Sequence, residues 1–151
     1  MAALRWTTAL SIGVPELDAH HEELFRRVDR LLDAMLVHDR SEAVRLLAFL
    51  QTYARDHFEA EERLMRESAY PDLELHVAEH VAFSAEIAEL VRTLAEQGPS
   101  ASLVLRLERE VTGWLRDHIY STDLALGRYL VSRRWTRSEP ATVSAGARSA
   151  S

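Results

Sequence analysis

Four segments of this chain each carry an apolar stripe whose members recur every three or four residues. This spacing places side chains on one face of an α-helix, where they pack against other helices. The stripe positions are Leu17, His21, Leu24, Val28, Leu31 and Met35; Leu46, Leu50, Tyr53, His57, Glu61 and Leu64; Leu73, His76, His80, Phe83, Ile87, Leu90 and Leu94; and Val104, Leu107, Val111, Trp114 and His118. The predicted helices therefore cover 16–38, 42–67, 73–96 and 101–131.

Short breaks separate these four segments. Ser41 is the expected N-cap of the second helix, Pro71 disfavours helix in the residue before it, and Gly98-Pro99-Ser100 ends the third helix. Because connections this short join antiparallel neighbours, we predict an all-α, up-down-up-down four-helix bundle. The bundle is expected at 16–131, after an N-terminal arm at 1–15 and before a flexible C-terminal tail at 132–151 that is rich in Ser, Ala, Arg and Thr.

Composition excludes several classes of protein. None of the 151 residues is cysteine, which rules out disulfides, iron–sulfur clusters and thiol catalysis. A formal net charge of −6 argues against a nucleic-acid surface. We see no apolar run of membrane-spanning length and no signal-peptide pattern at the N-terminus, so we expect a cytoplasmic protein with no membrane partner.

Histidine interrupts all four stripes at positions where the pattern asks for Leu or Ile. A single histidine on an apolar face is usually an ordinary core residue, but four stripes interrupted in the same way are harder to explain. Buried imidazoles and carboxylates are costly unless a partner compensates them, and a metal ion is such a partner. In an antiparallel bundle the start of the first helix, the end of the second, the start of the third and the later part of the fourth lie at one end, so these groups can converge there.

Spacing adds local detail to this hypothesis. His57 and Glu61, like His76 and His80, are four residues apart and stack on one helix face. His118 and Asp123 are five apart, which a regular α-helix would splay by about 140°. We therefore predict a π-type widening of the fourth helix there. The alternative is that Asp123 is an ordinary surface carboxylate.

The number of candidate ligands favours two ions over one. If both carboxylates bridge, one ion receives three imidazoles and two oxygens, and the other receives two imidazoles and two oxygens. One shared oxide or hydroxide then leaves a single open position on a pair of octahedral ions. The ligands alone do not decide the metal, because imidazole suits zinc, copper, iron and nickel.

Four stretches of sequence, together with Trp6, resemble the hemerythrin family, particularly its bacterial single-domain members. They are LDAHHEELF at 17–25, HFEAEERLM at 57–65, YPDLELHVAEHVAF at 70–83 and WLRDHIYSTD at 114–123. The resemblance implies two iron ions in an oxo- or hydroxo-bridged centre. By motif position, His76, His80 and His118 would bind the iron with a filled shell and His21 and His57 the iron with the open position, while Glu61 and Asp123 would bridge. It also places Phe58, Trp114, Leu115 and Ile119 around a dioxygen pocket.

Three residues lie close in sequence to the predicted ligands but are not expected to be ligands. His20 stands where related sequences usually have Gln, and the stripe rhythm favours its neighbour His21 as the ligand. Glu59 and Glu62 fall off the second stripe, so we expect them to be exposed or to touch the ligands only from outside.

The resemblance implies reversible dioxygen binding for storage, delivery or buffering, without catalysis. Nitric oxide and small anions are further expected ligands, and no protein partner is indicated. Two alternatives stay open: oxygen or nitric-oxide sensing through a partner, and turnover of peroxide or nitric oxide at the open iron. An H-x-x-E-H zinc-protease pattern at 76–80 would leave the other histidines unused. The Glu-x-x-His pairs of ferritin-like enzymes do not occur in the sequence.

Overall fold

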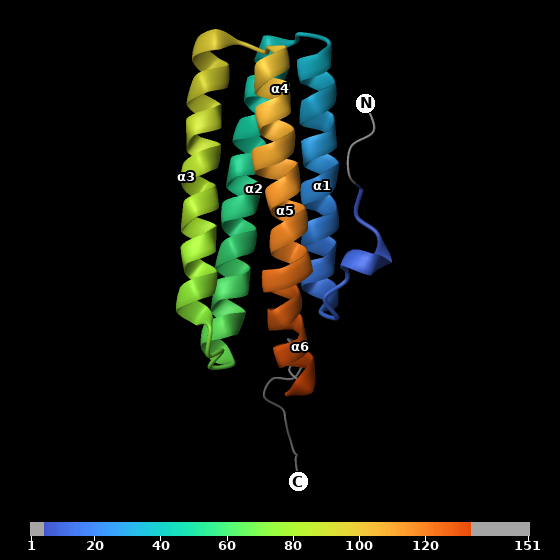
Figure 1. The fold of residues 1–151 in the computed structure, drawn as a ribbon, viewed down its shortest axis with the longest axis vertical. Coiled ribbons are helices and arrows are strands. Elements are labelled where there is room, and N and C mark those ends of the chain that lie inside the picture. Colours follow the sequence, from blue (N-terminus) through green and yellow to red (C-terminus); the bar gives the residue numbers. More distant parts are fainter. Residues whose placement is uncertain (1–4, 134–151) are drawn as a thin grey trace.

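The computed structural model describes residues 5–133, and all regular structure in this range is helical. A short 3₁₀ turn, η1 (Thr8–Leu10), precedes α1 (Pro15–Leu36), α2 (Arg40–Glu67) and α3 (Leu73–Gln97). The fourth rod is continuous but is divided into α4 (Ala101–Leu107), η2 (Glu108–Thr112), α5 (Gly113–Asp117), η3 (His118–Asp123) and α6 (Leu124–Ser132). Both η2 and η3 are π-helical. Figure 1 shows four antiparallel rods running up, down, up and down, which confirms the predicted fold class.

The limits of the predicted domains are only partly covered by this range. The arm predicted at 1–15 is described from residue 5 onward, and the tail predicted at 132–151 lies outside the described residues from 134 onward. Ser132 still belongs to α6. Within residues 5–133, no helix is both long enough and apolar enough to cross a membrane.

Polar caps and left-handed residues set the helix ends. Asp39 caps α2 by accepting a hydrogen bond from the Glu42 backbone N–H at 3.1 Å. The predicted N-cap at Ser41 is therefore wrong, since the helix already begins at Arg40; a carboxylate at this position also interacts favourably with the helix dipole. Similarly, α1 ends at Leu36 rather than at His38, because His38 has a φ of 57° and turns the chain toward α2.

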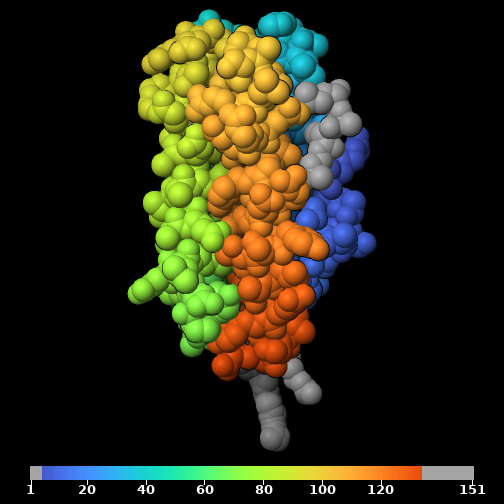
Figure 2. Space-filling model, in the orientation of Figure 1, coloured from blue at the N-terminus to red at the C-terminus, as the bar shows by residue number. Residues whose placement is uncertain are grey.

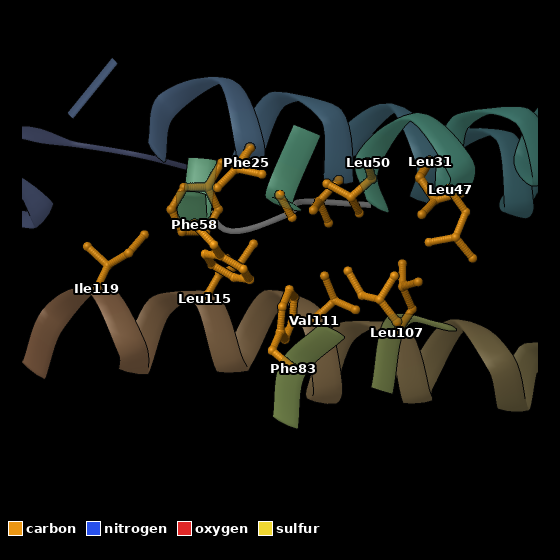
Figure 3. Close-up of a cluster of buried hydrophobic side chains, with 14 of the residues drawn as sticks. Phe25, Leu31, Leu47, Leu50, Phe58, Phe83, Leu107, Val111, Leu115 and Ile119 are labelled. Carbon is orange, nitrogen blue, oxygen red and sulfur yellow. The ribbon is translucent and has the colours of Figure 1, made fainter. Parts of the chain in front are cut away.

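The predicted stripes form the core, with one register error in α2. Leu47 and Ala54 are buried there, whereas the predicted Leu46 and Tyr53 are only partly buried. Because Leu46 and Leu47 are adjacent and both apolar, the periodic pattern alone does not decide which of them faces the core. Figure 3 shows how side chains from α1, α2, α3 and the fourth rod interdigitate. Complete burial of each large apolar side chain stabilises the fold by about 1.5–3 kcal/mol.

The N-terminal arm is fixed against both α1 and α6. Asp18 accepts hydrogen bonds from the Ser11 hydroxyl at 2.6 Å and from the Ile12 N–H at 2.9 Å. Ile12 is buried, and its carbonyl oxygen approaches α6 so closely that a Cβ added at Gly127 would lie 2.0 Å from it. Only glycine leaves room for the arm at this point. The arm thereby closes one side of the lower end of the bundle (Figure 1).

We predict that Gly127→Ala destabilises the protein by about 1–3 kcal/mol, because the new methyl group must displace the backbone of the arm. Denaturant unfolding monitored by circular dichroism measures this change. Gly113→Ala is the matched control, since its added Cβ meets no atom closer than 3.6 Å. The control should be neutral or stabilising by up to about 1 kcal/mol. Equal effects of the two substitutions would contradict the role given to Gly127.

Candidate metal centre

All seven predicted ligands converge inside the lower half of the bundle. They are almost completely buried, with exposed fractions of 0% for His21, 3% for His57, 0% for Glu61, 1% for His76, 2% for His80, 4% for His118 and 1% for Asp123. Figure 2 shows α3 and the fourth rod closed against each other over the visible face. The structure thus brings together every residue that the sequence singled out, although their role as metal ligands stays a prediction.

The side chains form two groups that share both carboxylates. His76, His80 and His118 make one group with Glu61 and Asp123, and His21 and His57 make the other with the same two carboxylates. Within each group, one potential ligand atom per residue lies within 4.8 Å of all the others. We call these the three-histidine group and the two-histidine group.

Glu61 offers one oxygen to each group. Its Oε1 lies 3.2 Å from His76 Nε2 and 3.1 Å from His80 Nε2. Its Oε2 lies 3.0 Å from His57 Nε2 and 3.4 Å from His21 Nε2. A carboxylate held in this way can bridge two cations.

Asp123 repeats this arrangement from the fourth rod. Its Oδ1 lies 3.0 Å from His76 Nε2 and 3.1 Å from His118 Nε2, and its Oδ2 lies 3.0 Å from His21 Nε2. Each carboxylate therefore directs one oxygen to the three-histidine group and the other oxygen to the two-histidine group.

The spacing of these atoms fits metal coordination. Two ligand atoms that are each about 2.1 Å from one ion, at right angles, are about 3.0 Å apart. Moreover, His80 Nε2, His118 Nε2 and Asp123 Oδ1 are buried without hydrogen-bond partners among the described residues, although each imidazole nitrogen lies 3.1 Å from a carboxylate oxygen. Buried polar atoms are rarely left in this state. The residues present therefore fit a pair of cations.

The π-helical segment η3 is what brings His118 and Asp123 to the same site. The wider turn lets residues five apart share a helix face, which a regular α-helix would prevent. The predicted widening is confirmed at His118–Asp123. The second π-helical segment, η2, was not predicted, because no ligand pair in the sequence marks its position.

In three of the five imidazoles, the nitrogen that faces away from the centre contacts another side chain. His57 Nδ1 lies 2.9 Å from His20 Nδ1, His80 Nδ1 lies 2.9 Å from Glu62 Oε2, and His118 Nδ1 lies 2.7 Å from Glu79 Oε1. His20 is thus outside the ligand cluster, as the stripe rhythm predicts. Sequence reasoning allowed a contact for Glu62 but missed Glu79. The available signal was an acidic residue directly beside a ligand position, at Glu61-Glu62 and Glu79-His80.

The two buried carboxylates strongly raise the pKa values of neighbouring imidazoles. Burial lowers the pKa of His21, but hydrogen bonds with Asp123 and Glu61 outweigh burial and raise this pKa to about 9. The same balance raises the pKa of His76 to about 10. Burial raises the pKa of Glu61, yet His57, His21 and His76 hold that pKa well below its usual range. Since metal-bound imidazoles must lose these protons, metal binding should release protons.

Aromatic rings cover the three-histidine group. Phe58 stacks on His80 with 3.9 Å between ring centroids, and Trp114 stacks on His118 with 4.3 Å. Leu115 and Ile119 are buried, and Figure 3 shows Leu115 directed toward Phe58 with Ile119 beyond it. Trp114 is only partly buried and lines a surface groove of 840 Å³. Of the four residues predicted for a dioxygen pocket, three are thus deep in the core.

Fold and site together define a class: a four-helix bundle whose helices carry a buried, carboxylate-linked cluster of histidines for cations. The sequence profile of the Hemerythrin HHE cation binding domain matches residues 12–130. The chain therefore belongs to the hemerythrin family.

Proteins similar in sequence and structure cover most of the chain. It is 31% identical to a bacteriohemerythrin of Methylococcus capsulatus over 84% of this chain and 96% of that protein. It is 29% identical to a bacteriohemerythrin of Aquifex aeolicus over 79% and 91%. A crystal structure of wild-type hemerythrin superposes with a TM-score of 0.77 at 30% identity, covering 85% of this chain and 98% of that one.

We predict that the metal-free protein loses stability as the pH rises from neutral. Because the folded-state pKa values of His21 and His76 lie above the unfolded value, their contribution is complete below about 6.5 and is lost through about 9 to 10. The free energy of unfolding should fall by up to about 1.4 kcal/mol per pH unit for each titrating group.

Urea unfolding of chelator-treated protein at a series of pH values measures this slope. His76→Gln removes one of the imidazoles whose pKa is raised and should make the slope shallower. A metal-free protein whose stability stays level or rises over this range would contradict the assignment.

Proposed function

We propose that this protein binds two iron ions and uses them to bind dioxygen reversibly, for storage, delivery or local buffering. The observation that carries the proposal is the division of each carboxylate between a three-histidine and a two-histidine group. Relatives named bacteriohemerythrin and hemerythrin support iron as the metal.

Counting protein ligands gives the two ions different shells. The three-histidine group with its two carboxylates supplies five ligand residues, and the two-histidine group supplies four. A shared oxide or hydroxide would add one ligand to each, giving six and five. Since octahedral ions take six, one position stays open beside His21 and His57. Dioxygen is the proposed ligand there, with nitric oxide or a small anion as competitors.

Iron supplies the electrons that dioxygen takes up on binding, and the protein side chains control access to the iron. Phe58 stacks on His80, and Leu115 and Ile119 are buried in the same apolar core. These side chains would exclude water from the centre, which slows the loss of reduced oxygen. In this proposal all seven ligand residues bind the ions, so none of them serves as an acid or base for turnover. These features favour reversible binding over turnover.

The central test combines metal analysis with optical spectra of the reduced protein before and after exposure to air. We expect two irons per chain and an absorption band that appears with oxygen and disappears when oxygen is removed, over repeated cycles. A native preparation that takes up no ferrous iron would disprove the proposal. Steady-state consumption of peroxide or nitric oxide above the rate of free iron would replace it with an enzymatic function.

We also predict that His118→Ala greatly weakens iron binding. Loss of groups that merely support a ligand typically costs 10–100-fold in affinity, so removal of a ligand should cost more than about 100-fold. His38→Ala is the matched control, because His38 is exposed and lies in the α1–α2 connection, away from the cluster. Retention of two tightly bound irons by the His118 variant would refute its assignment as a ligand.

A further inference from the structure

The outward-facing nitrogens of the five imidazoles have unequal partners. In the three-histidine group, His80 and His118 each contact a carboxylate, Glu62 and Glu79 respectively. In the two-histidine group, His57 contacts an imidazole, that of His20. The Nδ1 atoms of His21 and His76 are buried and have no hydrogen-bond partner in the described part of the chain. Both anionic partners therefore belong to the same group.

The carboxylate of Glu79 is held in place by a second contact. The Thr122 hydroxyl donates a hydrogen bond to Glu79 Oε1 at 2.9 Å, the same oxygen that contacts His118. This links α3 to the π-helical segment η3 beside Asp123. His118 is further restrained by Trp114, whose ring lies at an interplanar angle of 12° to it. A carboxylate and an aromatic face thus fix the orientation of this imidazole.

Glu62 holds His80 in an equivalent way from α2. The ring of Phe58 stacks on His80 at an interplanar angle of 9°, and Glu62 Oε2 contacts the edge of the imidazole. The side chain of Glu62 is 21% exposed and that of Glu79 is 46% exposed. Both carboxylates therefore lie at the boundary with solvent, where a negative charge is kept at little desolvation cost.

These contacts have an electronic consequence if the Nε2 atoms bind metal. A neutral imidazole bound through Nε2 carries its proton on Nδ1 and donates it to the outer partner. A carboxylate partner makes the ring a stronger electron donor than a neutral partner does. Stronger donors stabilise the more positive oxidation state of an ion. The ion of the three-histidine group receives two such donors and the other ion receives none.

We propose that Glu62 and Glu79 are positioning residues that make the iron of the three-histidine group the more easily oxidised of the two. This inference rests on the proposed function. In the oxidation concerned, ferrous iron gives one electron to dioxygen or to a chemical oxidant and becomes ferric, and no bond to either glutamate forms or breaks. The two irons would thus differ by their outer partners as well as by their ligand number.

The test uses Glu62→Gln, Glu79→Gln and the double variant, loaded with iron. Glutamine keeps one carbonyl oxygen as a hydrogen-bond acceptor at each position and removes the negative charge. Glu59→Gln is the control, since Glu59 is exposed on the same helix, three residues before Glu62. Spectroelectrochemical titration gives the ferric-to-ferrous ratio at a fixed potential, and Mössbauer spectra tell the two irons apart.

We expect each glutamine variant to lower the ferric-to-ferrous ratio of one iron about tenfold, equivalent to about 59 mV for one electron. In the double variant the shift in potential should be roughly the sum of the two single shifts. The control should show no shift. Zinc titration gives a readout free of redox chemistry, in which the variants but not the control should bind about 10–100-fold more weakly.

Two outcomes would overturn the inference while leaving dioxygen binding intact. One is a set of glutamine variants with the potentials of the control, and the other is an equal shift of both iron signals. If the wild-type protein itself takes up no iron pair, the proposed function fails first and the inference fails with it. Because the two glutamates lie on different helices, one variant that loses helical content would still leave the other to decide.

Discussion

The structure depends on a balance of charge in the lower half of the core. Two carboxylates, Glu61 and Asp123, are buried there with five imidazoles around them. Neither carboxylate would be tolerated alone at this depth, because an unpaired buried charge is strongly destabilising. In the metal-free protein the raised pKa values of His21 and His76 favour their protonated forms, which compensate this charge. Two cations would resolve the same conflict and would give His80 Nε2, His118 Nε2 and Asp123 Oδ1 the partners that they lack.

The fold supplies the geometry that this balance requires. Antiparallel order brings parts of all four rods to one depth, and η3 corrects the one place where regular helix geometry would fail. The arm seats on α6 directly beyond η3, through the close approach of Ile12 to Gly127. Residues far apart in the sequence therefore support the same end of the bundle. The backbone beside the proposed iron centre is therefore held in place by the packing of the rods and by the contact of the arm with α6.

Much of this arrangement was predictable from sequence because periodicity and ligand spacing are local properties. The stripes identify the rods, the histidines mark the cluster, and the five-residue step from His118 to Asp123 signals the π-helical turn. Other features depend on contacts between rods. The choice of Leu47 over Leu46, the Glu79–His118 contact and the need for glycine at position 127 follow from packing partners that no single segment reveals.

The two halves of the bundle differ in a way that bears on assembly. Leu31, Leu47 and Leu107 pack together in the apolar core of one half of the bundle (Figure 3), whereas the cluster of histidines and carboxylates lies in the other half. We expect the surface buried in this apolar half to hold the helices together without any ion. A zinc finger is unfolded without its metal. For this chain we expect the opposite order, in which the bundle folds first and binds metal afterwards.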